Sequence, residues 1–159
     1  MTTMSERTVH VATIDDVIRQ ITWEGHKHSL HTLNRPDIGL TMPQMITLFA
    51  IRAAGTCRMS ELAEVTQQSA GTLTGIVDRL IEDGLVGRVR DTDDRRVVQV
   101  VLTSAGEERL IRVEQARCED MEHILDHFTL DQLCQLEGLL YLLLDGIHNQ
   151  PGHVPLHGR

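Results

Sequence analysis

The segment SAGTLTGIVDRLIEDGLV occupies residues 69–86, and its pattern decides the fold. Its apolar side chains recur at the spacing of one helical face, at Leu73, Ile76, Val77, Leu80 and Ile81. Ser69 precedes the pattern and is a residue type that caps helix N-termini. Gly84 follows it and favours the left-handed conformation that ends many helices. We therefore predict a helix that is capped by Ser69, runs to about Asp83 and buries one face.

Two shorter helical patterns precede this segment. The first begins after Thr41, has Pro43 near its first turn and ends near Gly55, and the second covers residues 60–65. Only a turn, residues 66–69, separates the second pattern from the helix that follows it. Two helices joined by so short a turn form a helix-turn-helix unit. The second helix of such a unit can enter the major groove of DNA.

The pattern changes after Gly84 to that of two β-strands. Valines dominate residues 85–103, and a charged, turn-like segment, 90–95, interrupts them. This arrangement predicts a β-hairpin with a long charged tip. The hairpin carries four arginines between residues 88 and 96. Because arginine is drawn into narrow A·T-rich minor grooves, the hairpin is a second candidate for DNA contact.

The predicted DNA-contacting surface thus has two parts. On the helix, the candidates are outward positions and small hydroxyl side chains near the N-terminus, namely Ser69, Gly71, Thr72, Thr74, Gly75 and Arg79. On the hairpin, the candidates are Arg88, Arg90, Asp94, Arg95 and Arg96. Asp94 is included because a carboxylate can orient a neighbouring arginine through a charge-assisted hydrogen bond. Asp91 and Asp93 are alternatives for that role.

Helical patterns also flank the region 41–103. One covers residues 14–33, with a weak point near Gly25, and two more cover residues 104–128 and 130–149. The second half of the last helix is apolar on nearly every side and must therefore be buried. A second copy of the chain is the simplest partner. The expected dimer contacts are Ile14, Val17, Ile18, Ile21, Leu136, Leu139, Leu140, Leu143 and Ile147. Trp23 is expected either at this dimer interface or in a ligand pocket.

The length of 159 residues fits a single domain with a mainly α fold and one small β-hairpin. Within residues 1–159 we expect a winged helix-turn-helix lobe at 41–103. A helical dimerisation region would comprise 10–35 and 104–150, and a flexible tail would comprise 151–159.

Composition limits the other classes of function. The net charge of -8 by itself argues against nucleic-acid binding, but residues 103–159 alone hold four basic and ten acidic side chains. The acidity can therefore lie away from the DNA-contacting surface. We find no catalytic motif, cofactor loop or metal-ligand spacing, no membrane-spanning run and no signal peptide, which predicts a cytoplasmic protein that is not an enzyme. Cys57 is expected in a loop, where its thiol could react, and Cys118 and Cys134 are expected to pack as small apolar residues.

Four segments together resemble the MarR family of transcription regulators. They are TMPQM at 41–45, MSELA at 59–63, the segment 69–86 and RVRDTDDRRVVQVVLTSAG at 88–106. The resemblance implies a homodimer whose two lobes bind a palindromic operator, with the Asp94–Arg96 pair anchoring an arginine in the minor groove. It also implies, for many members, release by a small phenolic ligand, and for others oxidant sensing through a cysteine in the first helix. This chain has no cysteine there, and it has Gly75 where many relatives carry a large side chain.

We therefore predict a sequence-specific DNA-binding regulator, a repressor in its simplest form, with double-stranded DNA, a second copy and a small-molecule effector as partners. The alternative is a winged-helix protein-interaction module that does not bind DNA. Salt dependence separates the two, because only DNA binding releases counterions.

Overall fold

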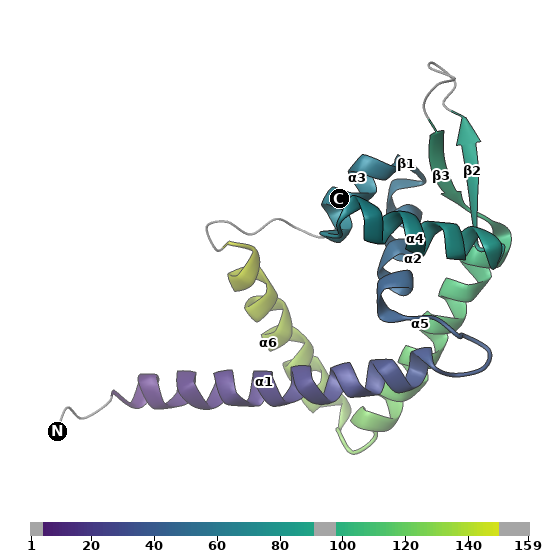
Figure 1. Ribbon diagram of the computed structural model, residues 1–159. Helices are drawn as coiled ribbons and strands as arrows, with labels where there is room; N and C mark the ends of the chain where they lie inside the picture. The colour runs from purple at the N-terminus through teal and green to yellow at the C-terminus, as the bar shows by residue number, and fades with distance from the viewer. Residues whose placement is uncertain (1–4, 91–97, 150–159) are drawn as a thin grey trace. The chain divides into compact units, whose positions relative to one another are not determined.

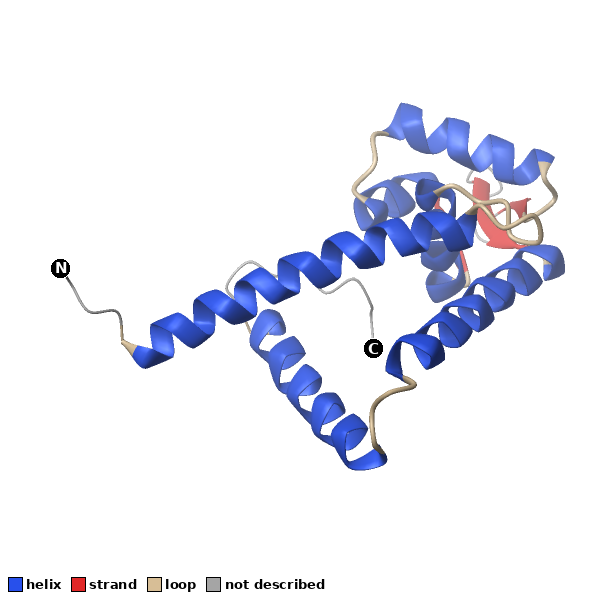
Figure 2. Cartoon of the chain, turned by 90° about the horizontal axis from the view of Figure 1, so that it is seen from below, coloured by secondary structure: helices blue, strands red, loops and turns tan. Residues whose placement is uncertain are grey.

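The computed structural model describes residues 5–90 and 98–149. Helices make up most of the chain, with one small sheet, which confirms the predicted fold class (Figures 1 and 2). The chain divides into two compact units, Met1–Met42 and Pro43–Arg159. No helix within the described residues is long and apolar enough to cross a membrane.

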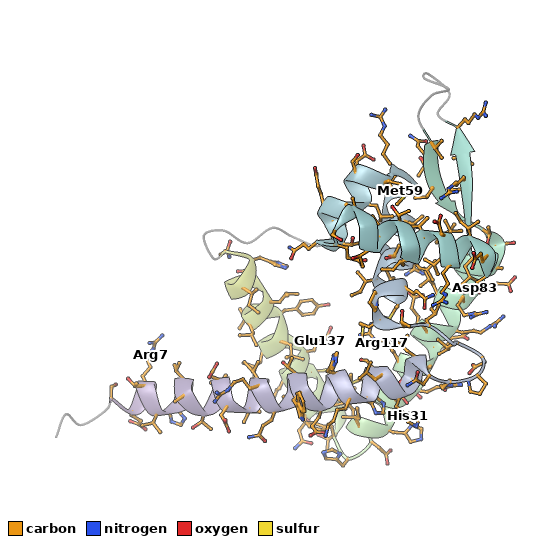
Figure 3. All side chains as sticks on the ribbon, viewed as in Figure 1. Arg7, His31, Met59, Asp83, Arg117 and Glu137 are labelled. Atoms are coloured by element: carbon orange, nitrogen blue, oxygen red, sulfur yellow. The ribbon has the colours of Figure 1, made fainter. Side chains whose placement is uncertain are left out.

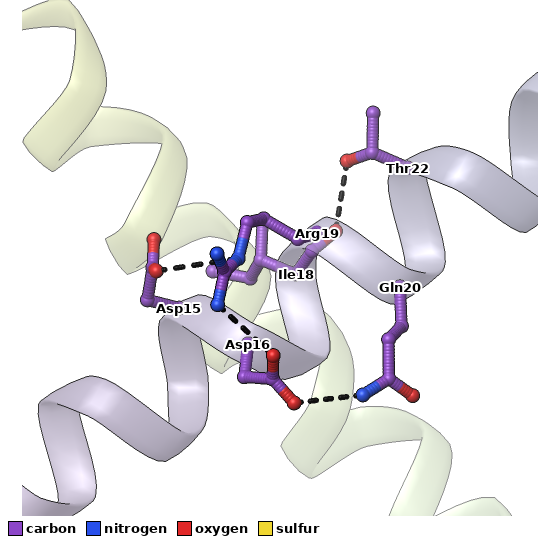
Figure 4. Close-up of polar contacts among 6 residues, drawn as sticks. All are labelled: Asp15, Asp16, Ile18, Arg19, Gln20 and Thr22. Atoms are coloured by element: carbon purple, nitrogen blue, oxygen red, sulfur yellow. Dashed lines mark hydrogen bonds and ion pairs between the residues drawn. The ribbon is translucent and has the colours of Figure 1, made fainter.

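The first unit is dominated by α1, Glu6–Leu33. The helix begins eight residues before the predicted start at residue 14, so that boundary was wrong, and it continues through Gly25 as one helix, as predicted. Figure 4 shows one reason: Arg19 forms ion pairs with Asp15 and Asp16, one turn away, and Gln20 donates a hydrogen bond to Asp16. Such pairs at i, i+3 and i, i+4 stabilise an exposed helix, and a single glycine costs only about 1 kcal/mol.

The helix-turn-helix unit consists of α2, Met42–Ala54, α3, Met59–Thr66, and α4, Ala70–Glu82. Gly55 has a positive φ of 72°, as expected for the residue after a helix. Gln67 supplies the left-handed residue, with φ of 54°, in the turn between α3 and α4. One apolar core joins the three helices, and its fully buried members include Leu48, Ile51, Leu62, Leu73, Val77 and Leu80.

The predicted hairpin is present as β2, Val86–Arg90, paired antiparallel with β3, Val98–Leu102. A third strand, β1, Thr56–Arg58, pairs with the other edge of β3 and was not predicted. Cys57 lies on β1 opposite Val100 and is only 4% exposed, so the prediction of a loop cysteine was wrong. Burial raises the pKa of the Cys57 thiol, and the Glu61 carboxylate raises it further, which leaves less of the reactive thiolate.

A tight corner joins the sheet to α5, Ser104–Leu125. The Thr103 hydroxyl accepts a hydrogen bond from the Gly106 backbone N–H and donates one to the carbonyl of Gly84. Gly106 is buried, and a Cβ there would overlap the carbonyl oxygen of Leu85. Only glycine fits this approach, so the start of α5 is held directly against the end of α4 and the start of β2.

The second half of α5 and all of α6, Leu130–His148, differ from the core in their exposure. Early residues of α5, Leu110, Val113 and Ala116, are buried, whereas α6 has no buried residue. The predicted burial of the last helix is thus not provided by its own chain, and burial by a second copy stays a prediction. Cys118 and Cys134 are exposed in the same region, contrary to their expected packing.

Candidate nucleic-acid interface

The N-terminus of α4 presents a set of ordered hydroxyl groups. The Ser69 Oγ accepts a hydrogen bond from the Thr72 backbone N–H at 3.2 Å and lies 2.8 Å from the Thr72 Oγ1. This confirms the predicted cap. The Thr74 hydroxyl donates to the Ala70 carbonyl at 2.8 Å, so its remaining lone pairs can only accept. One of the Ser69 and Thr72 hydroxyls donates its proton to the other, so one hydroxyl proton of the pair remains to donate to a ligand.

The exposed face of α4 includes two positions without a side chain. Gly71 and Gly75 are exposed, and a Cβ added at either would meet no atom within 4 Å. Glycine at both positions lets another molecule approach the helix backbone closely. Arg79 is exposed on the same helix and has no ion pair among the described residues. Figure 3 marks Asp83, which follows the last turn of this helix. The outward candidates therefore share one accessible surface.

The two hairpin arginines that the structure describes differ in their contacts. Side chains alternate along a strand, so Arg88 and Arg90 lie on the same face of β2 as the buried Val86. The Arg88 Nη2 lies 2.5 Å from the Asp78 Oδ1 on α4, whereas Arg90 is exposed and has no ion pair among residues 5–90 and 98–149. The other hairpin candidates, Asp94, Arg95 and Arg96, and the predicted tail 151–159 lie outside the described residues.

Sequence reasoning missed Asp78. Its position one turn after Thr74 places both residues on one helical face, and that spacing was a usable signal. The helical pattern could not reveal the partner of Asp78, because Arg88 lies ten residues later on another element.

A cavity of about 440 Å³ lies between α2, α3 and α5. Apolar side chains from α2 and α3 line it, including Met45, Ile46, Phe49 and Val65. At its polar end, Arg52 donates hydrogen bonds to Glu114 and Glu107 of α5, and its guanidinium lies 4.9 Å from the Phe49 ring centroid. The hydrogen bond from Arg52 lowers the pKa of Glu114, and the same bond raises the pKa of Arg52.

Trp23, the predicted candidate for a ligand pocket, is not among the residues that line this cavity and is 64% exposed. Sequence reasoning missed the cavity because its polar end joins residues 52 and 114, which no local pattern connects.

Comparison with known proteins agrees with this arrangement. The sequence model described as the MarR family matches residues 40–98. The HTH-type transcriptional regulator YsmB of Bacillus subtilis is 30% identical over 134 residues, which cover 84% of this chain and 90% of YsmB. The HTH-type transcriptional repressor MdtR of the same organism is 30% identical over 97 residues, 61% of this chain and 63% of MdtR.

Among solved structures, a MarR family protein from Bacillus stearothermophilus superimposes with a TM-score of 0.78 and 29% identity. The match covers 92% of this chain and 99% of that protein. Similarity of this extent includes the helices on both sides of the winged helix-turn-helix unit. The chain therefore belongs to the MarR family and is a DNA-binding transcription regulator, not an enzyme.

Proposed function

We propose that this regulator is a repressor that binds a palindromic operator as a homodimer and releases it when a small molecule binds. The observation that carries the proposal is the accessible face of α4, in which two glycines and ordered hydroxyls surround a helix N-terminus beside the hairpin. A repressing role is supported by the similarity to MdtR, which is named a repressor.

In the proposed complex, α4 enters the major groove, which is about 12 Å wide and admits one helix. Thr74 accepts hydrogen bonds from base amino groups, Ser69 and Thr72 contact a base edge or phosphate, and the free N–H groups of the first turn bind phosphate. Gly71 and Gly75 permit the close approach, and Arg79 adds a positive charge. The hairpin places Arg90, Arg95 and Arg96 in the neighbouring minor groove, with Asp94 orienting Arg96.

The proposed dimer interface is formed by α1 and α6. In α1, every residue from 6 to 28 is exposed, including the four predicted contacts Ile14, Val17, Ile18 and Ile21. In α6, the exposed apolar side chains include Leu139, Leu140, Leu143 and Ile147, while Leu136 is half-buried. So much exposed apolar surface on one chain marks an interaction site. A helix with no buried residue is marginal by itself, so α6 needs a partner to be stable.

Symmetry then sets the form of the operator. A homodimer related by a two-fold axis presents two copies of α4 in opposite orientations, so the DNA must contain an inverted repeat. The two half-sites would be about one helical turn apart, 10–10.5 base pairs, or a multiple of it.

The cavity between α2, α3 and α5 is the proposed effector site. Its apolar wall suits an aromatic or aliphatic ring, and Arg52 supplies a fixed donor for an acidic group. An acidic ligand would compete with Glu114 for Arg52, and this competition would alter the connection between α2 and α5. Since α5 is also held against the α4–β2 corner, a change there can reach the DNA-contacting surface. We also propose that the protein acts in the cytoplasm, where bacterial DNA lies.

The test begins with selection of duplexes from a random library by the purified protein. The proposal predicts an inverted repeat, bound by two chains, whose affinity falls steeply between 50 and 200 mM salt, by about 1,000-fold or more for six to ten phosphate contacts. Failure to enrich any duplex, or binding that is insensitive to salt, would contradict it and favour a protein partner.

A further inference from the structure

The ion pair between Asp78 and Arg88 connects the two parts of the proposed DNA-contacting surface. Asp78 belongs to α4 and Arg88 to β2, and their side chains are 48% and 53% exposed. Figure 1 shows α4 beside the β2–β3 hairpin, and the ion pair joins α4 to β2. Among the described residues, neither side chain makes another hydrogen bond or ion pair, so each group is the charged partner of the other.

The position of Asp78 is unfavourable for DNA binding unless its charge is neutralised. Asp78 lies four residues after Thr74 and three after Gly75, so all three share the face of α4 that would enter the groove. A free carboxylate there would repel the phosphates on either side. Arg88 removes this repulsion, and in doing so it uses the charge that would otherwise be available for a phosphate.

The position of Arg88 gives the pair a geometric role. Arg88 is paired with Val100 of β3, the central strand, and is thus fixed to the sheet. Arg90 lies two residues nearer the tip on the same face, about 7 Å further along the strand. A bond from Asp78 to Arg88, the middle residue of β2, therefore sets the direction in which the strand carries Arg90 away from the helix.

We propose that Arg88 is a positioning residue rather than a DNA contact, and that the Asp78–Arg88 pair fixes the hairpin against α4 so that both reach their grooves together. The inference rests on the proposed DNA-contacting surface and refines it. It predicts that the pair contributes to discrimination between DNA sequences, since only a correctly spaced operator uses helix and hairpin at once.

Asp78→Asn distinguishes a positioning role of the ion pair from simple charge repulsion, because the two predict changes of opposite sign in affinity for the operator. The variant removes a negative charge from the surface, so affinity for a shuffled duplex of equal composition should rise about twofold. Affinity for the selected operator should instead fall by about two- to fivefold, the range expected for an exposed ion pair. Asp83→Asn is the matched control, because it removes the same charge next to the same helix and Asp83 has no ion pair among the described residues. In that control both affinities should rise together.

Arg88→Gln gives a second, independent result. A phosphate-contacting arginine contributes about one to the slope of log affinity against log salt, and its loss reduces that slope by about one. A positioning residue leaves the slope for the shuffled duplex unchanged. Arg88→Gln should reduce affinity for the operator less in a protein that already carries Asp78→Asn than in the wild type, because its charged partner is already absent.

Two results would overturn the proposal. One is an equal rise in both affinities for Asp78→Asn, and the other is a salt slope lowered by about one for Arg88→Gln. Failure of the underlying surface would be different. In that case Arg79→Gln and Arg90→Gln would also leave operator affinity unchanged, whereas failure of this inference alone leaves those two variants impaired.

Discussion

Leu140→Asp tests whether the exposed face of α6 is a dimer interface. In one chain the Leu140 side chain is 54% exposed, so a charge there costs little unless a partner covers it. Burying a whole leucine contributes about 1.5–3 kcal/mol. A symmetric interface buries the exposed half of the Leu140 side chain in each of its two copies, which together contribute about 1.5–3 kcal/mol as well. An unpaired buried carboxylate adds several kcal/mol. A total above about 4 kcal/mol raises the dimer dissociation constant at least 1,000-fold.

Sedimentation velocity over a concentration series measures this dissociation constant directly. Gln135→Asp is the matched control, since it introduces the same charge at an exposed polar position of α6. Circular dichroism should show that the core of α2, α3 and α4 remains folded in the variant, because none of its buried residues comes from α6. A Leu140→Asp protein that stays dimeric with an unchanged dissociation constant would refute the proposed interface.

Three further outcomes follow from the same structure. Arg96→Ala should weaken operator binding without changing dimerisation, and equal affinities in an anisotropy titration would remove Arg96 from the minor groove. Gly106→Ala should lower the free energy of unfolding in urea by about 1–3 kcal/mol, because the added Cβ overlaps the Leu85 carbonyl oxygen, and a wild-type midpoint would show that the corner yields. Glu114→Gln should lose a modest stabilisation at neutral pH but match the wild type in acid. The pKa of Glu114 is lowered on folding, so its contribution to the free energy of unfolding is complete above the ordinary glutamate pKa and disappears as pH falls through the folded pKa. A difference in stability between variant and wild type that persists in acid would contradict this.

Local patterns predicted the helix-turn-helix unit and the hairpin because each depends on residues close in sequence. The helical face of Leu73, Val77 and Leu80 became the buried face of α4, and Ser69 became its cap. The fold class followed from these elements, and so did the outward positions of the candidate site.

Long-range contacts explain most of what the sequence did not predict. Strand β1 is three residues long, which is too short for an alternation of apolar and polar residues to indicate a strand. It forms because it pairs with the edge of β3. The burial of Cys57 is a consequence of that pairing. The same reason applies to the Asp78–Arg88 pair and to the contact of Arg52 with Glu114, each of which joins separate elements.

Methylation interference on the selected operator tests the proposed contacts of α4 and of the hairpin together, because one reagent modifies bases in both grooves. Dimethyl sulfate modifies guanine N7 in the major groove and adenine N3 in the minor groove. If two copies of α4 bind a palindromic operator, N7 methylation should interfere in two symmetric half-sites about one helical turn, or a multiple of it, apart, and N3 methylation should interfere in the minor groove next to each. Interference confined to one half-site, or its absence from the major groove, would contradict the claim that two copies of α4 bind a palindromic operator.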